Sequence, residues 1–441
     1  MIRKLLPPLA LVGALALVPL TTATVAAADT DTYKELETFM GVFERVRANY
    51  VDTVDDHTLI KGAIDGMLAS LDPHSSYVEA SDFAQLKTTT DGNYGGLGLS
   101  VTQEDGTVKV ISPTEDTPAD RAGIKSGDYI THLDGELLYG LDLDASVEKM
   151  RGPPGSAIKL TIVRPGRDKP FDVTLRRERI ELRPVKWELK DGVGVLNINQ
   201  FSANVGEQVA AALTAMDKAA GSAKPIGYIV DLRSNPGGLL DEAVSVSDAF
   251  LERGEIVSER GRARDDIERF YARPGDLTAG KPLIVLVDAG SASAAEIVAG
   301  ALQDHRRALV MGERSFGKGS VQTVIQLDQA SALRLTTARY YTPSGRSVQA
   351  GGIEPDILVP QLSDPDYKDR PTVREADLRR HLISQNKVDD KLLEKDANVD
   401  PRFSASAAEL EKKGIKDFQL DYAVKTLRRL ATGPAGTSRA G

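Results

Sequence analysis

The segment around Ser293 carries a hydroxyl in a place suited to acyl-transfer chemistry. A continuous apolar run at 283–287 is followed by a turn of small residues and then by a helical pattern that begins at Ala294. A bulky acyl group can approach a hydroxyl in such a turn, and N–H groups at a helix start can stabilise an oxyanion. The same stretch, Ser293-x-x-Glu296, is also a capping box, in which the serine only caps the helix. The residues alone leave both roles open.

A serine nucleophile also needs a proton acceptor. Lys318 lies in a glycine-rich loop after the next apolar strand, 309–312, and adjacent parallel strands would bring both loops to one edge. To act as a base, a lysine must lose roughly 3 units from its ordinary pKa of about 10.4, and burial near Phe316 can supply this. Gln322 offers a neutral amide that can orient the amine. The five histidines give no comparable partner, since even the nearest, His305, lies about a helix length from Ser293: His57, His74, His132, His305 and His381.

The Lys318 loop has two alternative interpretations, and a further turn is a candidate part of the site. The Lys318 loop matches a phosphate-binding loop up to Gly319, which replaces the Ser or Thr that would bind Mg²⁺. A solvent-exposed lysine in a flexible loop is the other alternative. The Pro-Gly-Gly turn at 236–238 follows another apolar strand and precedes a helix, so its N–H groups can form a second oxyanion donor beside that of Ala294, or only an ordinary turn.

Alternating strands and helices must position these loops. The periodicity predicts strands at 193–198, 225–231, 282–287, 309–312 and 332–340, and helices at 202–220, 240–250 and 294–303. This alternation predicts an α/β core with partly parallel strands and a ligand site beyond their carboxyl ends. Helical patterns with one apolar stripe flank it, at 32–70 and again after Pro360.

Residues 91–178 differ from the core in being β-rich. The pattern predicts strands at 108–111, 128–133, 157–164 and 171–175 and short helices at 118–122 and 143–150, which make a small barrel or sandwich. The segments 94–99 and 118–130 resemble a PDZ domain. This resemblance implies that the loop of Gly96, Leu97, Gly98 and Leu99 holds the terminal carboxylate of a peptide, while the peptide adds a strand to the sheet edge.

Composition excludes several classes of protein. The net charge is −9 and no basic block occurs, so nucleic acid is not an expected partner. Cysteine is absent, which excludes thiol nucleophiles and disulfides, and no metal-ligand spacing is found. Arg3 and Lys4 precede an apolar run at 5–20 and an alanine cluster at 26–28, which is typical of a signal peptide cleaved near Ala28. An uncleaved signal would instead tether the protein to the membrane.

Five ordered segments resemble the carboxyl-terminal processing peptidases, the tail-specific serine proteases of family S41. They are DLRSNPGG at 231–238, GSASAAE at 290–296, GERSFGKGSVQ at 312–322, YYTPSGRS at 340–347 and GIEPD at 352–356. The resemblance implies a Ser-Lys dyad of Ser293 and Lys318 with Gln322 positioning the lysine, and oxyanion donors at Gly237 and Ala294. Asp288 and Ala295 stand where this family often has Asn and Ser, and neither is a reacting group. Arg151 is a candidate for coupling peptide binding to catalysis, with an ordinary solvated arginine as the alternative.

Together these features predict a fold and a function. We expect an α/β protease core with ClpP/crotonase-like β-α units, an inserted PDZ domain and helical end segments. The expected divisions are a signal peptide at 1–28, a helical segment at 29–90, the PDZ domain at 91–178, the core at 179–360, a helical segment at 361–431 and a disordered tail at 432–441. The expected function is a cofactor-free, metal-free periplasmic serine endopeptidase that recognises apolar C-terminal tails. We expect it to be a dimer or larger homo-oligomer and leave open an adaptor protein. The alternative is a non-catalytic PDZ scaffold that binds tails.

Overall fold

The computed structural model describes residues 30–79, 82–83, 90–104, 106–328, 331–367, 372–384, 400 and 403–432. The expected signal peptide at 1–28 lies outside the described residues, as does the expected tail except for Thr432. The chain divides into two compact units, residues 1–66 and 67–441. No helix in the described ranges combines the length and the apolar character that crossing a bilayer requires.

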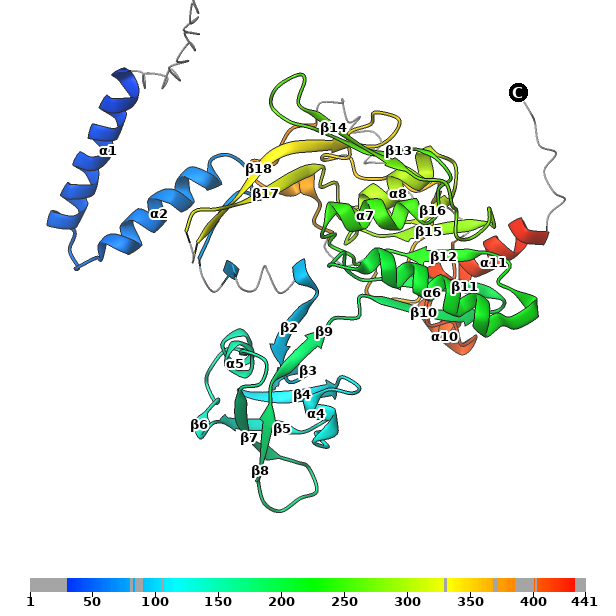
Figure 1. Cartoon of the computed structure of the whole chain (residues 1–441), viewed down its shortest axis with the longest axis horizontal. Helices are drawn as coiled ribbons and strands as arrows, with labels where there is room; N and C mark the ends of the chain where they lie inside the picture. The colour runs from blue at the N-terminus through cyan, green and yellow to red at the C-terminus, as the bar shows by residue number, and fades with distance from the viewer. Residues whose placement is uncertain are drawn as a thin grey trace, which may run out of the picture. The chain divides into compact units, whose positions relative to one another are not determined.

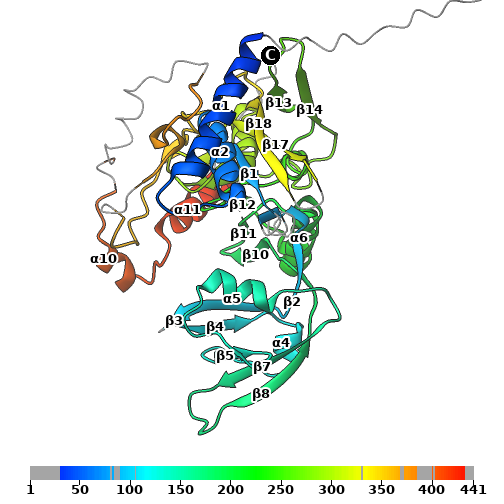
Figure 2. The ribbon, with the colours of Figure 1, turned by 90° about the vertical axis from the view of Figure 1, so that its left-hand side faces the viewer.

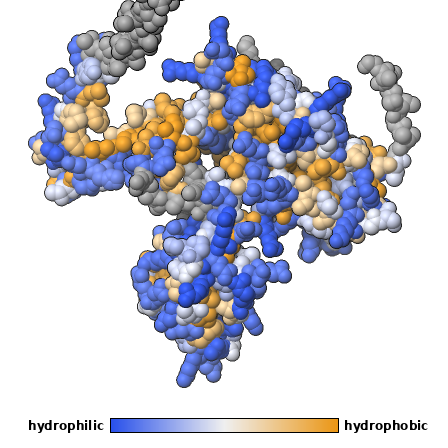
Figure 3. Space-filling model, in the orientation of Figure 1, coloured by the Kyte–Doolittle hydropathy of each residue, from blue (hydrophilic) through white to orange (hydrophobic). Residues whose placement is uncertain are grey.

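The first unit contains helix α1 (Thr30–Asn49) and most of α2 (Asp56–Ala69). The two helices are separated by a break at 50–55, within the stretch 32–70 that the sequence pattern predicts to be helical. Large apolar side chains of α1 are between 45% and 63% exposed: Tyr33, Leu36, Phe39, Met40 and Val42. Figure 3 shows apolar residues gathered over these helices. This stripe is therefore uncovered within the described residues of its own unit.

The central sheet of the second unit is mostly parallel. Its strands lie in the order β10 (Val185–Lys190), β11 (Val193–Ile198), β12 (Tyr228–Asp231), β15 (Leu283–Val287), β16 (Leu309–Gly312) and β19 (Ile357–Leu358). Only β10 runs antiparallel to its neighbour. Because β11, β12, β15 and β16 are parallel neighbours, the loops that follow them share one edge of the sheet.

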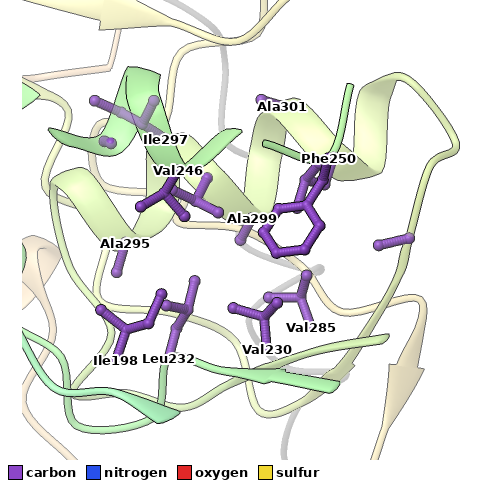
Figure 4. Close-up of a cluster of buried hydrophobic side chains, with 14 of the residues drawn as sticks. Ile198, Val230, Leu232, Val246, Phe250, Val285, Ala295, Ile297, Ala299 and Ala301 are labelled. Carbon is purple, nitrogen blue, oxygen red and sulfur yellow. The ribbon is translucent and has the colours of Figure 1, made fainter. Parts of the chain in front are cut away.

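Alternate side chains of these strands feed two hydrophobic cores. On one face, Val230, Leu232 and Val285 pack against helices α6 (Val205–Ala220), α7 (Leu240–Asp248) and α8 (Ala294–Asp304), as the labelled side chains in Figure 4 show. On the other face, Ile229 and Ile284 pack against α11 (Phe418–Thr432). Both faces of the sheet are covered over β11, β12, β15 and β16, which explains why these strands are mostly apolar, whereas the edge strand β10 is largely exposed.

A second sheet lies across α7 and α8 from the first (Figure 1). Its strands are β1 (Ser76–Val78), β13 (Gly254–Arg260), β14 (Ile267–Ala272), β17 (Ser320–Gln326) and β18 (Ala332–Tyr341). Strand β17 pairs with β18 and, among the described strands, with no other, whereas β1 and β13 pair with the opposite side of β18. The sequence analysis found β18 but not β1, β13, β14 or β17.

The β-rich domain has the expected elements. Strand β2 (Asn93–Gly96) pairs with β9 (Glu178–Glu181). A separate sheet orders β3 (Leu99–Glu104), β4 (Thr107–Pro113), β5 (Tyr129–Leu133), β7 (Ala157–Val163) and β8 (Phe171–Arg176), with β6 (Glu136–Leu137) beside β5. Helix α4 (Pro118–Arg121) is short, and α5 (Leu143–Met150) lies alongside β3 in Figure 2.

The C-terminal segment differs in part from the prediction. Residues 372–384 hold only a 3₁₀ turn, Glu375–Asp377, where we expected a helix. The reason is that Glu375 is buried and its carboxylate accepts from Gln349 and pairs with His74, which ties the segment down locally. Helices α10 (Ala407–Lys412) and α11 follow, and α11 continues to Thr432, which we had placed in the tail. The expected fold class, an α/β core with an inserted β-rich domain and helical end segments, is confirmed.

Candidate active site

Loops from four parallel strands enclose a pocket of about 390 Å³ at the carboxyl edge of the central sheet. Its lining includes Phe201 after β11, Gly238 after β12, Ser293 and Ala294 after β15, and Lys318 after β16. Gln322 also lines it, from β17. The structure thus brings Ser293, Lys318, Gln322 and Ala294 to one pocket. In the ranges that the structure describes, no three His, Cys, Asp or Glu side chains are grouped as metal ligands.

Ser293 occupies the N-cap of α8 in a strained conformation. Its φ is 56°, which a residue with a side chain rarely adopts and which often marks a functional site. Its N–H donates to Glu296 Oε2 at 2.8 Å, so the expected capping geometry is present. Gly237 packs against it, since a Cβ there would lie 2.7 Å from Ser293 Cβ and 2.9 Å from the Ala294 nitrogen. Any larger residue at 237 would displace Ser293.

Lys318 is half-buried, and its environment disfavours the charged form. Burial lowers the pKa of its amine, and the positive charge of Arg334 lowers it further. Its backbone N–H donates to Glu296 Oε2 at 2.9 Å, the same oxygen that accepts from Ser293. The pKa of the lysine is therefore shifted in the direction that a general base requires, and its loop is fixed to the serine through one carboxylate.

Glu296 is a central residue that the sequence analysis treated only as a cap. It is fully buried and accepts from the two backbone N–H groups above, from Gly317 N at 2.7 Å and from Ser315 Oγ at 2.5 Å. Burial raises its pKa to about 7, against these four hydrogen bonds, which favour the carboxylate. Its spacing of three residues from Ser293 was the only sequence signal for this role.

Tyr340 is a second residue that sequence reasoning missed. It lines the pocket, and its hydroxyl donates to the Lys318 carbonyl oxygen and also hydrogen-bonds the Ser293 side chain. Burial raises its pKa well above the ordinary value, so the hydroxyl keeps its proton. The motif containing Tyr340 was noticed, but nothing in the sequence places its hydroxyl between the two loops.

Gln322 lines the pocket, and its amide is fixed by neighbouring hydroxyls. Its Nε2 donates to Ser320 Oγ at 2.9 Å and to Thr336 Oγ1 at 3.3 Å. Thr336 in turn donates to the buried carboxylate of Asp72 at 3.1 Å. With Nε2 engaged in this way, Oε1 is left as the acceptor of the amide.

The Pro-Gly-Gly turn differs from expectation at Gly237. The Gly237 N–H, expected to be an oxyanion donor, donates to Asn235 Oδ1 at 2.8 Å, while Asn235 Nδ2 donates to the Ile198 carbonyl at 2.7 Å. Gly238 is the glycine of this turn that lines the pocket. The buried Asn235 amide thus closes the turn on itself, which sequence spacing does not reveal.

An ion-pair network holds the base of the same turn. Arg233 Nη2 lies 2.6 Å from Asp231 Oδ2 and 2.7 Å from Asp417 Oδ2, and its Nη1 donates to Gln419 Oε1 at 3.0 Å. Burial alone would raise the pKa of Asp417, but the hydrogen bond from Arg233 lowers it to about 2. The start of α11 therefore contacts the turn that faces Ser293.

The β-rich domain contains a separate pocket of about 240 Å³ between β3 and α5. Its lining includes the four expected loop residues, Gly96, Leu97, Gly98 and Leu99, together with Arg151. Gly98 has a φ of 75°, and a Cβ there would lie 2.3 Å from Thr117, so only glycine fits. The Arg151 guanidinium lies 5.2 Å from the Tyr94 ring centroid and 3.0 Å from Glu148. The expected loop is thus beside a groove at an open sheet edge.

Comparison with known proteins gives three family matches. The model of peptidase family S41 matches residues 192–359, that of the PDZ domain matches residues 95–175, and that of the activating protease CtpB N-terminal domain matches residues 19–82.

Similar whole chains carry related names. The carboxy-terminal-processing protease of Bartonella bacilliformis is 49% identical over 399 residues, covering 90% of this chain and 89% of that one. The carboxy-terminal processing protease CtpB of Bacillus subtilis is 35% identical over 350 residues, covering 78% and 71% respectively. Among solved structures, the photosystem II D1 C-terminal processing protease is 28% identical, covering 75% of this chain and 93% of that one, with a TM-score of 0.44.

Proposed function

Because the chain belongs to the carboxy-terminal processing proteases of peptidase family S41, we propose that it is a serine endopeptidase with Ser293 as nucleophile and Lys318 as general base. One observation carries this proposal: a strained serine and a half-buried lysine of lowered pKa line the same pocket and share the Glu296 carboxylate. An exposed lysine or a serine used only as a cap would not need this arrangement.

The proposed reaction proceeds through an acyl-enzyme. The neutral Lys318 amine takes the proton of Ser293 Oγ as that oxygen attacks the peptide carbonyl carbon. The Lys318 ammonium then protonates the leaving amine, the peptide C–N bond breaks, and the acyl group stays on Ser293. The lysine next takes a proton from water, which attacks the ester, and Ser293 recovers its proton when the product acid leaves. Each turn of the cycle restores both residues.

The neighbouring groups have supporting roles in this proposal. The Ala294 N–H, at the start of α8, stabilises the oxyanion, with the Pro-Gly-Gly turn at Gly237 as second donor once its bond to Asn235 opens or is shared. Gln322 accepts from the Lys318 amine through Oε1, since Nε2 is engaged by Ser320 and Thr336. It orients the amine without adding a charge.

The PDZ domain suggests how substrates are chosen. Strand β3 pairs only with β4 among the described strands, so a peptide can add beside it, and the loop at 96–99 can receive its terminal carboxylate. The pocket there is lined largely by apolar residues, including Leu99, Val101 and Val147, which favours apolar tails. Arg151, in the same pocket, would then sense the bound tail.

Location and assembly remain part of the proposal. The charged start, apolar run and alanine cluster of the first 28 residues support export to the periplasm, and an uncleaved signal would retain the protein at the membrane. The exposed apolar stripe of α1 supports a homo-oligomer, because such stripes are usually covered.

The test uses purified wild type, Ser293→Ala and Lys318→Ala with an unfolded protein that ends in an apolar tail. We expect cleavage by the wild type and none by either variant, with Lys224→Ala, which changes an exposed lysine, as the matched control. Cleavage that survives in both variants would exclude the dyad. Tail binding without any cleavage by the wild type would favour the scaffold alternative, and equal rates with a charged tail would contradict tail selection.

A further inference from the structure

Arg334 is a charged side chain in the catalytic pocket that has no partner among the residues that the structure describes. It lines the pocket from β18 and is half-buried. Its Nε is buried without a hydrogen bond, and the guanidinium makes no hydrogen bond or ion pair with any residue that the structure describes. Buried arginine atoms are nearly always paired, so this one calls for a partner from outside the chain.

The buried carboxylate of Asp72, which accepts from Thr336 two residues along β18 from Arg334, is already satisfied. Asp72 accepts from the N–H groups of His74 and Ser75 and from the hydroxyls of Ser75 and Thr336. Opposite Arg334 on β17 stands Val324, which offers only apolar surface. The Glu259 carboxylate also lines the pocket, but Glu259 pairs with Tyr340, ~20 Å along β18 from Arg334, so it does not neutralise the guanidinium.

The register of β18 places Arg334 along the path of a bound peptide. Arg334 and Thr336 lie on one face of β18, a bulge follows before Ala338, and Tyr340 beyond the bulge lines the pocket and contacts Ser293. Six residues of strand separate Tyr340 from Arg334, which corresponds to ~20 Å. Gln322 stands opposite Thr336, between them. The pocket thus runs along β17 and β18 from the nucleophile to the arginine.

We propose that Arg334 binds a carboxylate of the substrate at about four to six extended residues from the scissile bond. This inference rests on the proposed protease function and adds a specificity-determining residue to it. Guanidinium and carboxylate form two parallel hydrogen bonds, and a partly buried setting strengthens them. Two sources share this chemistry: an Asp or Glu side chain, or the free C-terminal carboxylate of the segment that is cut off.

The test compares matched peptides on the full-length protein. One series of quenched fluorescent peptides carries a single Glu or Gln at each position from three to seven residues on either side of the cleaved bond. A second series ends that number of residues after the bond, with a free acid or an amide. The measured quantity is the ratio of kcat/KM between the two members of each pair, in wild type, Arg334→Gln, Arg334→Lys and Arg339→Gln. Arg339 is the control, because it lies on the same strand but does not line the pocket.

We expect a ratio of 10 or more in favour of the carboxylate at one position in wild type and Arg339→Gln. The ratio should fall to within twofold in Arg334→Gln, whatever its absolute rate, and be partly retained in Arg334→Lys, which keeps the charge. A preference in the Glu series assigns the side chain, and one in the acid series assigns the chain terminus. A wild-type ratio near 1 throughout, or a ratio that persists in Arg334→Gln, would overturn the proposal. If no peptide of either series is cut by wild type, the protease function itself fails, which is a distinguishable result.

Discussion

Replacing Glu296 by Gln should separate stability from activity in this protein. Glu296 Oε2 accepts from the backbone N–H groups of Ser293 and Lys318, and Oε1 accepts from Gly317 and Ser315. A glutamine has one oxygen and one NH₂ group, so whichever way it turns, two of the four donors lose their acceptor. Hydrogen bonds to a charged group contribute ~1.5–3 kcal/mol each. If the free energy of these two lost hydrogen bonds adds to the activation barrier, kcat falls ~10²–10⁴-fold.

The effect on folding has the opposite sign above neutral pH. Burial raises the pKa of Glu296 from an ordinary 4.5 to about 7, which corresponds to ~3 kcal/mol. A carboxyl whose pKa is higher in the folded state stabilises the fold below the unfolded pKa, and this stability is lost as pH rises through the folded pKa. The wild type should thus lose ~3 kcal/mol between pH 4.5 and 8, whereas the glutamine variant, which carries no charge, should not.

The assay has two parts. Urea unfolding at several pH values, in a Ser293→Ala background that prevents self-digestion, gives the stability of each chain, and peptide hydrolysis gives kcat. We expect Glu296→Gln to be more stable than its parent by up to ~3 kcal/mol at pH 8, equal to it near pH 4.5, and catalytically impaired. Glu188→Gln, on the exposed side of β10, is the control. A Glu296→Gln protein that keeps kcat within threefold, or that is less stable than its parent at pH 8, would refute this reasoning.

Three further predictions follow from the site. Lys318→Arg should lower kcat at least 10³-fold with little change in KM, because a guanidinium stays protonated at neutral pH; recovery of activity below pH 8 would contradict the base assignment. Asp417→Asn should cost ~2 kcal/mol of unfolding free energy at pH 7 and almost nothing at pH 2, since the pKa of Asp417 is lowered to about 2 by Arg233 and its contribution is lost as pH falls from 4 to 2. Gly98→Ala should abolish tail binding measured by calorimetry, because its Cβ would meet Thr117, whereas Gly127→Ala, with a φ of 86° but no neighbour within 4 Å, should retain it.

The parts of the fold that the sequence reveals are those whose burial is uniform. Strands 193–198 and 309–312 were predicted with the bounds that β11 and β16 have, because both faces of each are covered and all their residues except Asn197 are apolar or glycine. The parallel pairing of β15 with β16 then accounts for the meeting of the Ser293 and Lys318 loops. Local pattern and one rule of sheet topology were sufficient here.

What the sequence does not reveal depends on long-range pairing. Strands β14 and β17 are largely exposed and carry no continuous apolar run, so their places in the sheet come only from their partners β13 and β18, and β17 thereby reaches the active-site pocket. The Tyr340 hydroxyl, the Asn235 amide that takes the Gly237 N–H, and the unpaired Arg334 are likewise products of three-dimensional assembly. None of them has a spacing that distinguishes it from an ordinary strand or turn residue.

The ion pair between Arg233 and Asp417 joins residues 184 positions apart. During synthesis the Arg233 turn leaves the ribosome long before its second carboxylate exists, because Asp417 and α11, which bears Gln419, follow all the strands of the central sheet in the chain. Until then the turn opposite the Ser293 loop has only one of its two carboxylate partners, Asp231. The turn that packs against Ser293 therefore gains its full set of ion pairs only after residues 417–419 have been made.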